Sequence, residues 1–307
     1  MTDKDIKAKA YEDFVQSSNS LFHFMGKYGY LEAAIQDKAL SPRYCVENIE
    51  YLNLKLNEEH FTEIAVLQKC FCDIPLHNIM KSFEINEVDN KIGSLSESDK
   101  LGKNTHPGFY GEFAIAFSKG WGQKMKLQPV HYLNEDSYYT ESFTDFFNSA
   151  IEDEHLSDDY SDEILSRLSF FKPIRGIMPK DFGKLGVINI SKNFHDEHEW
   201  RYIPQSSTLK KLKLHSVIAN LKTIENKDDI NIINKNINSK EYEKIKLKFN
   251  YDDIKYILVP NSNFRNDIID TIKMIPTTSM DNIGEVEMQK YILISKILVL
   301  DEIRKDW

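Results

Sequence analysis

The sequence predicts an α+β fold in which short strands and helices follow one another without a regular order. Apolar or alternating runs of strand length lie between amphipathic stretches with a helical period. These runs do not form the repeated strand–helix–strand units that build a parallel sheet. The chain also lacks a G-x-G-x-x-G motif and a Walker loop, which argues against a doubly wound nucleotide-binding fold.

Composition indicates a soluble protein with a packed core. The chain has 307 residues, of which 41% are hydrophobic and 28% are charged, and we find no internal repeat and no linker, so we expect one domain over residues 1–307. A net charge of −9 argues against a broad, sequence-independent grip on nucleic acid. Three cysteines, no apolar leader and no run near the roughly 18 apolar residues of a membrane span predict a reduced, cytoplasmic protein.

The N-terminal half is expected to alternate strands with short helices. We expect a short helix within residues 1–20 and a polar loop over Ile85–Lys103. The expected strands are Leu21–Gly26, Ile64–Leu76, Phe109–Ser118, Pro129–Leu133 and Ile174–Met178. The expected helical segments are Leu31–Leu40, Trp121–Lys126 and the acidic stretch Phe143–Phe171.

The C-terminal third, residues 206–307, is expected to contain three units. Leu209–Leu221 has the pattern of a basic amphipathic helix, and Asn226–Ser239 is expected to interrupt ordered structure. Ile254–Pro260 predicts a buried strand that leads directly into an Asn-capped helix over Phe264–Ile275. Glu285–Arg304 predicts one long amphipathic C-terminal helix.

The densest group of ionisable and aromatic residues lies in Phe194–Ile203. If this stretch is a strand, Glu197, Glu199 and Arg201 share one face, and the aromatic side chains share the other. The Cα atoms of Glu197 and Glu199 would then be about 6–7 Å apart, close enough for each carboxylate to raise the other's pKa. The alternative is a polar strand face whose Glu and Arg side chains are solvated.

Cys45, Cys70, Cys72 and His77 include types that bind zinc. A C-x-C pair without a second ligand pair is a weak zinc signal, and thiols buried in a strand explain the pattern better. No metal site is therefore expected.

Six short motifs in order resemble the bacterial abortive-infection family AbiGi over about residues 20–205. They are Leu21–Phe24, Pro42–Cys45, Cys70–Leu76, Tyr110–Ile115, Pro129–Tyr132 and Glu197–Arg201. The resemblance implies phage resistance encoded by a two-gene locus, in which family members are commonly labelled antitoxins to a nucleotidyltransferase-like toxin. It therefore implies a cognate toxin as partner, and it implies no particular chemistry.

The same layout more distantly resembles ADP-ribosyltransferases of the diphtheria-toxin-like branch, which implies a mixed or antiparallel sheet core with surrounding helices. His23, Tyr110 and the Glu197–Glu199 pair occur in the corresponding order. The resemblance implies NAD as cofactor, with Glu199 stabilising an oxocarbenium-like transition state and Glu197 assisting.

The remaining cofactor contacts implied by this resemblance have open alternatives. His23 and Tyr110 would hold the dinucleotide, although a core histidine satisfied by the backbone also explains His23. Either Tyr110 or Tyr44 would stack on nicotinamide. Arg43 would bind phosphate, or else it caps a helix or pairs with a nearby acid.

Three functions follow as hypotheses. The first is NAD-dependent ADP-ribosyl transfer or NAD cleavage in phage defence. The second is a non-catalytic antitoxin, and the third is a nuclease-like toxin that uses acidic residues and a divalent metal, although no ligand spacing requires it. Contact with nucleic acid is expected only locally, through Leu209–Leu221.

Overall fold

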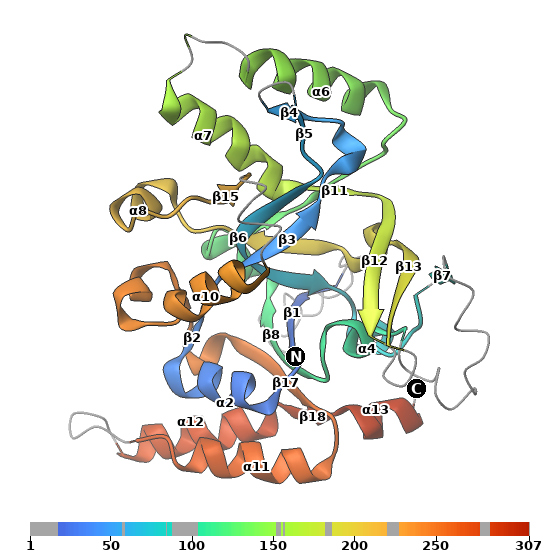
Figure 1. Cartoon of the computed structure of the whole chain (residues 1–307). Coiled ribbons are helices and arrows are strands. Elements are labelled where there is room, and N and C mark those ends of the chain that lie inside the picture. The colour runs from blue at the N-terminus through green and yellow to red at the C-terminus, as the bar shows by residue number, and fades with distance from the viewer. Residues whose placement is uncertain are drawn as a thin grey trace, which may run out of the picture.

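A nine-stranded, mostly antiparallel sheet runs through the centre of the computed structural model (Figure 1). The structure describes residues 18–56, 59–83, 85–87, 104–151, 155, 157–181, 186–219, 227–276 and 283–306. The main path of the sheet is β18 (Ile297–Val299), β17 (Ile254–Val259), β8 (Phe113–Ser118), β1 (Ser20–Met25), β6 (Glu63–Asp73), β14 (Glu199–Tyr202) and β9 (Gln128–Pro129). Strands β3 (Arg43–Asn48) and β15 (Val217–Ile218) also pair with β6.

Strand β6 is the longest strand, and it changes partners along its length. Its last residues pair with β1 only at Leu21↔Asp73 and Phe22↔Cys72. Its first residues pair with β3, beginning at Arg43↔Gln68. The sheet therefore splits between Gln68 and Cys72, and the split positions the candidate site described below.

One face of the sheet is covered by helices that lie at the bottom of Figure 1. They are α2 (Tyr28–Asp37), α11 (Ser262–Lys273) and α12 (Ile283–Ser295), with α5 (Lys119–Lys124) at one side. Their apolar side chains form a core with β8 and β17, in which Phe117 stacks on Trp121 with ring centroids 3.9 Å apart. Burial of these apolar faces is the main stabilising contribution.

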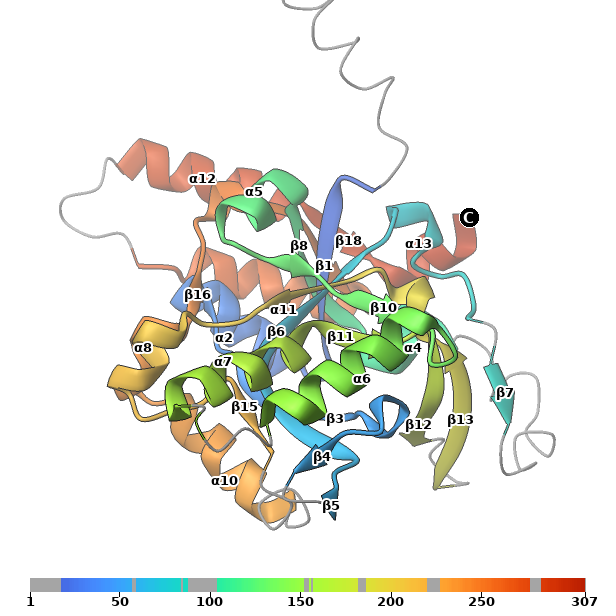
Figure 2. The same ribbon diagram turned by 90° about the horizontal axis from the view of Figure 1, so that it is seen from above.

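A second core lies at the other end of the molecule, under α6 (Tyr138–Ile151) and α7 (Asp158–Arg167), which lie in the foreground of the view from above (Figure 2). Helix α6 contacts β4 (Lys55–Leu56), which pairs with β5 (Glu59–His60). Phe147 is fully buried there beside Phe61. A third core joins α8 (Ser206–Lys211) and α10 (Lys227–Ile237) to β3 and β6.

Smaller sheets and short helices complete the fold. A three-stranded sheet contains β12 (Arg175–Asp181), β13 (Val187–Asn193) and β7 (Ile85–Glu87). Strands β10 (His131–Leu133) and β11 (Phe171–Pro173) pair in parallel, and β2 (Ala39–Leu40) pairs with β16 (Leu247–Lys248). The short helices are α4 (His106–Tyr110) and α13 (Leu300–Asp306).

The predicted α+β class is confirmed. The strands β1, β6, β12 and β17 lie where apolar or alternating runs predicted them, and the acidic stretch contains two helices, α6 and α7. Helix α11 is capped as expected, because the Asn261 side chain accepts hydrogen bonds from the backbone N–H groups of Asn263 and Phe264.

Two predictions for the C-terminal third are wrong, one because a local helical pattern was overlooked and one because strand pairing ends a helix early. Asn226–Ser239 is not a break but contains α10, whose Ile230, Ile233 and Ile237 recur at helical spacing and pack against β3 and β6. The basic helix predicted over Leu209–Leu221 ends at Lys211, since the chain must turn back to pair β15 with β6.

The single helix predicted over Glu285–Arg304 is also wrong. It is two helices, α12 and α13, separated by β18, which pairs in parallel with β17 from Ile297 to Val299. A run of apolar residues fits a buried strand as well as a helix, and here the open edge of β17 selects the strand. The helix expected in residues 1–20 and most of the loop expected over Ile85–Lys103 lie outside the described residues.

Candidate functional site

The stretch that carries the two candidate carboxylates is only partly a strand. Phe194–Glu197 forms a 3₁₀ turn, and His198 adopts a left-handed conformation with φ of 46° before β14 begins at Glu199. The expectation that Glu197 and Glu199 share a strand face is therefore wrong. The turn places Glu197 outside the strand, while Glu199 and Arg201 point into the interior and Trp200 and Tyr202 pack against the core.

Glu199 is held by two cations. Its Oε1 accepts a hydrogen bond from Nε of Arg201 at 2.7 Å, and its Oε2 accepts from Nζ of Lys172 at 2.8 Å. Arg201, which is fully buried, also donates to Glu47 at 3.1 Å and to the Ser169 carbonyl at 2.7 Å. Glu199 is thus the centre of a paired, hydrogen-bonded charge network.

Glu197 is held in the same way from the other side. Lys172 Nζ lies 2.8 Å from its Oε2 and Lys192 Nζ lies 2.6 Å from its Oε1. The Tyr110 hydroxyl also donates a short hydrogen bond to Glu197. Lys192 is fully buried, with its ammonium over the ring of Phe83 at 3.8 Å.

This network balances its charge. Glu47, Glu197 and Glu199 are paired with the cations Lys172, Lys192 and Arg201. Burial alone would raise the pKa of Glu199, but Arg201 and Lys172 outweigh burial and hold the pKa well below its usual range. The pKa of Glu197 is likewise lowered, because Lys172 and Lys192 outweigh the effect of burial. Both carboxylates are therefore ionised and paired. The charge of Glu199 still raises the pKa of Glu197, as expected, but the two lysines outweigh it.

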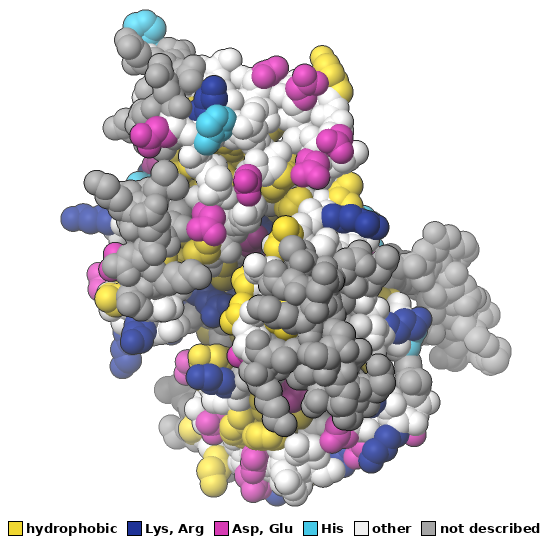
Figure 3. All heavy atoms as spheres, turned by 45° about the vertical axis from the view of Figure 1, so that its right-hand side comes forward, with side chains coloured by type: hydrophobic (Ala, Val, Ile, Leu, Met, Phe, Trp, Pro, Cys, Tyr) yellow, Lys and Arg dark blue, Asp and Glu magenta, His cyan; other side chains and the backbone are white. Residues whose placement is uncertain are grey.

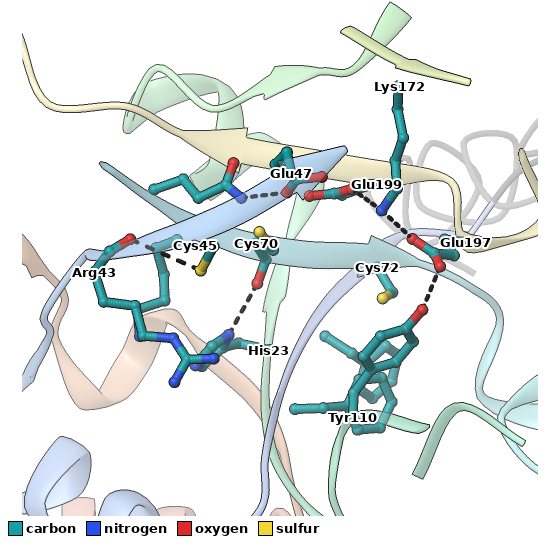
Figure 4. A pocket seen from close by; sticks show the side chains of 14 residues that line it. His23, Arg43, Cys45, Glu47, Cys70, Cys72, Tyr110, Lys172, Glu197 and Glu199 are labelled. Atoms are coloured by element: carbon teal, nitrogen blue, oxygen red, sulfur yellow. Dashed lines mark hydrogen bonds and ion pairs between the residues drawn. The ribbon is translucent and has the colours of Figure 1, made fainter. Parts of the chain in front are cut away.

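A cavity of about 230 Å³ opens beside this network, at the split in the sheet (Figure 4). It brings together five of the six side chains that the sequence singled out. They are His23, Arg43, Tyr110, Glu197 and Glu199. In the close view, His23 and Arg43 lie at one end, while Glu197, Glu199 and Lys172 lie at the other.

His23 occupies the position where β1 leaves β6. Its Nδ1 lies 2.8 Å from the Cys70 carbonyl oxygen, and its ring packs against Phe71. Burial, together with the positive charge of Lys69, lowers the pKa of His23 well below its usual value. His23 is therefore neutral at pH 7, and it is a backbone-bonded histidine that also lines the cavity.

Tyr110 and Tyr44, the two tyrosines expected as candidates for stacking on nicotinamide, lie in different parts of the structure. Tyr110 lines the cavity, but it ends helix α4 and does not lie on the predicted strand, which begins only at Phe113. The helix begins at a Thr105 cap with proline in its first turn, a start signal that overrides the alternating pattern. Tyr44 does not line the cavity, because its ring is buried in the third core, where its hydroxyl donates to the His215 carbonyl at 2.5 Å.

Lys172 and Lys192 are the residues of the site that the sequence analysis missed. Lys192 follows Ile188 and Ile190 at period two, so it occupies an inward position of β13. A lysine at the inward position of an alternating strand requires a buried partner, and Glu197 lies five residues later. Lys172 precedes proline in a three-residue strand, where no periodic signal is available.

The described residues include the four candidate zinc ligands Cys45, Cys70, Cys72 and His77. No three His, Cys, Asp or Glu side chains in this part of the chain cluster so as to hold a metal ion. Cys45, Cys70 and Cys72 are free thiols, and burial raises the pKa of Cys72 well above its usual value.

The fold and site define an α+β protein with a buried charge network beside a small cavity. Residues 99–260 match a family model described as "Putative abortive phage resistance protein AbiGi, antitoxin". The chain is also 35% identical over 284 residues to the Abortive phage resistance protein AbiGi of Lactococcus lactis subsp. cremoris, covering 88% of this chain and 100% of that protein. The chain therefore belongs to the AbiGi family, as the six motifs indicated.

Other comparisons add less. No solved structure matches the chain, so the resemblance to ADP-ribosyltransferases remains a prediction from the sequence. Across the described helices, none is both long enough and apolar enough to span a membrane.

Proposed function

We propose that this protein is the antitoxin of a two-gene phage-defence locus and silences its toxin by binding it through the outer face of α6 and α7. The family description, which includes the word antitoxin, supports the role. The observation that carries the proposal is the combination of negative charge and exposed aromatic rings on these two helices.

The charge of this region is one-sided. Between Leu127 and Ser166 the sequence has eleven of its 48 acidic residues and none of its 39 basic ones. Figure 3 shows Asp and Glu side chains spread over the upper part of one face, where Figure 1 places α6 and α7. A protein with a net charge of −9 therefore concentrates its negative field at one end.

Aromatic side chains lie within the same acidic region. Tyr138, Tyr139, Phe146 and Tyr160 are between 60% and 82% exposed. Tyr139 and Phe146 are seven residues apart and so lie on one side of α6, whereas Phe147, about 100° further round the helix, is buried in the core. Exposed aromatic anchors at helical spacing are typical of binding energy hot spots.

These features fit a partner with a basic surface. The resemblance implies a nucleotidyltransferase-like toxin, and an enzyme that handles nucleotides or nucleic acid carries positive charge around its substrate. An acidic, aromatic helix face would cover such a surface by electrostatic steering and aromatic packing. Silencing then requires no chemistry from Glu197 or Glu199.

The proposal is tested by expressing the toxin of the same two-gene locus in cells together with this protein and measuring growth. Cells expressing this toxin with the Tyr139→Ala/Phe146→Ala double variant should stop growing, whereas cells with the wild-type protein should grow. The matched control is Met288→Ala/Tyr291→Ala, which removes two exposed apolar side chains from α12. Equal protection by both double variants, at equal protein levels, would refute binding through α6.

A second candidate function, NAD cleavage, is favoured by one observation. His23, Arg43, Tyr110, Glu197 and Glu199 line a common cavity although they come from different elements. The engagement of both carboxylates by Lys172, Lys192 and Arg201 counts against it, because a catalytic carboxylate must meet the ribose. Purified protein incubated with NAD, alone and with the toxin, should leave the dinucleotide intact; release of nicotinamide that Glu199→Gln abolishes would establish the enzymatic function.

A further inference from the structure

The end of the cavity opposite the charge network has two cations without a carboxylate. Arg43 and Lys69 both line it. Among the described residues, neither forms an ion pair with an Asp or Glu, unlike Lys172, Lys192 and Arg201 at the other end. We propose that Arg43 and Lys69 form a binding site for the phosphate group of a small phosphorylated ligand.

The charges around the cavity do not cancel. The three acidic side chains near the cavity, Glu47, Glu197 and Glu199, already have three cationic partners. The cavity as a whole therefore has an excess of two positive charges, contributed by Arg43 and Lys69. A doubly charged phosphate neutralises this excess, and the planar Arg43 fork suits two of its oxygens.

Lys69 is the group whose position most needs an anion. Its side chain lines the cavity from β6, beside the point where the sheet splits, and Arg43 begins the neighbouring strand. Burial, followed by the charge of Arg43, lowers the pKa of Lys69 to about 8. Two like charges held together in a partly enclosed space destabilise the empty protein, and an anion between them removes this cost.

The neighbouring uncharged groups define the rest of the ligand. The side-chain amide of Gln68 donates to Glu47 at 2.6 Å, while its carbonyl oxygen is buried with no protein partner in the described structure. Gln68 also lines the cavity, between the two cations and the charge network. The neutral His23 ring adds a flat surface beside the two cations.

The size of the cavity limits the ligand. At about 230 Å³ it is smaller than the roughly 300–1,000 Å³ sites that enclose drug-sized molecules. It therefore suits a phosphate with a few attached atoms, such as a sugar phosphate or the ribose phosphate of a mononucleotide. Because α6 and α7 contribute no residue to the lining, this site is independent of the proposed toxin-binding face.

The experiment measures binding of inorganic phosphate, pyrophosphate and AMP to the full chain by calorimetry and by thermal unfolding. We expect at least one of them to bind and to raise the unfolding midpoint. Lys69→Met and Arg43→Gln should each weaken that binding by roughly 10–100-fold, the usual effect of one charge-assisted hydrogen bond. The control Lys211→Met removes an exposed lysine on α8 and should leave binding unchanged.

The unfolding temperature of the ligand-free protein is a second readout, which applies even if the variants change stability. Without ligand, Lys69→Met should unfold at a higher temperature than the wild type, because it removes an uncompensated cation. The proposal is overturned if none of the three probes binds at millimolar concentration, or if Lys69→Met and Arg43→Gln bind as tightly as Lys211→Met. Tighter binding of AMP than of inorganic phosphate would assign the sugar or base to the Gln68 side of the cavity.

Discussion

Arg201 should be the most sensitive charged residue for stability. Arg201→Met preserves much of the apolar stem but removes every hydrogen bond that the guanidinium makes. It leaves Glu199, which is 4% exposed, with Lys172 as its remaining cation, and it also leaves the Ser169 carbonyl without this donor. Breaking a buried pair from one side costs about 3–5 kcal/mol, since the remaining charge stays buried.

The assay is urea denaturation at pH 7 with fluorescence of the three tryptophans, comparing free energies of unfolding. Arg167→Met is the matched control, because Arg167 is 67% exposed and pairs with the exposed Glu163 at 3.4 Å. The control should change the free energy by less than about 1 kcal/mol.

A neutral pair gives an internal check on the cause. In Glu199→Gln/Arg201→Met both charges of the pair are removed, so part of the stability lost in Arg201→Met should return. If Arg201→Met costs less than about 1 kcal/mol, or the second substitution adds its full cost, the buried network does not stabilise the fold as described.

Three further predictions concern the same network and the cavity. The pKa values of Glu197 and Glu199 are lowered from 4.5 in the folded protein, so the unfolded chain takes up protons at a higher pH than the folded one. The free energy of unfolding should therefore fall as the pH drops below about 4.5, and acid titration followed by circular dichroism measures this fall. The pKa of Lys69 falls from 10.5 to about 8, so its contribution to stability should rise by up to about 3 kcal/mol between these pH values, and the rise should be absent in Lys69→Met in parallel urea titrations. Tyr110→Phe removes a donor to Glu197 and should cost about 1–3 kcal/mol in the same urea assay, whereas Tyr138→Phe on the surface should cost almost nothing.

Local sequence patterns were sufficient for much of the sheet. The mostly apolar run from Ile64 and the mostly apolar run from Ile254 each end at a proline, so they predicted β6 and β17 without knowledge of their partners. An asparagine cap was likewise predicted for the helix after β17, and α11 has one, although it begins at Ser262 rather than at Phe264. These elements are set by residues within a few positions of one another.

Long-range pairing explains the elements that local patterns misplaced. Ile297–Val299 is a strand because β17 presents an open edge some forty residues earlier in the chain, which no window around α12 reveals. Residues after Lys211 leave the helix to reach β6 at Val66. In both segments the sheet provides hydrogen bonds that outweigh helix propensity.

The candidate site could be predicted as a group but not as a network. The sequence pointed to five residues that line one cavity, because uncommon types cluster in short motifs. It did not reveal that Lys172 lies between Glu197 and Glu199, since this depends on the 3₁₀ turn and on the left-handed His198. Charge pairing across separate strands has no periodic signal in a single sequence.

Binding through the acidic, aromatic face of α6 and α7 can be measured as the affinity of this protein for the toxin of its locus. Wild-type protein and the α12 control, Met288→Ala/Tyr291→Ala, should bind with equal affinity, and binding should weaken as salt is raised. Tyr139→Ala/Phe146→Ala should reduce the affinity by about 100-fold or more if these rings are hot spots. Unchanged affinity in that variant, with its fold intact by circular dichroism, would mean that the toxin does not bind this face.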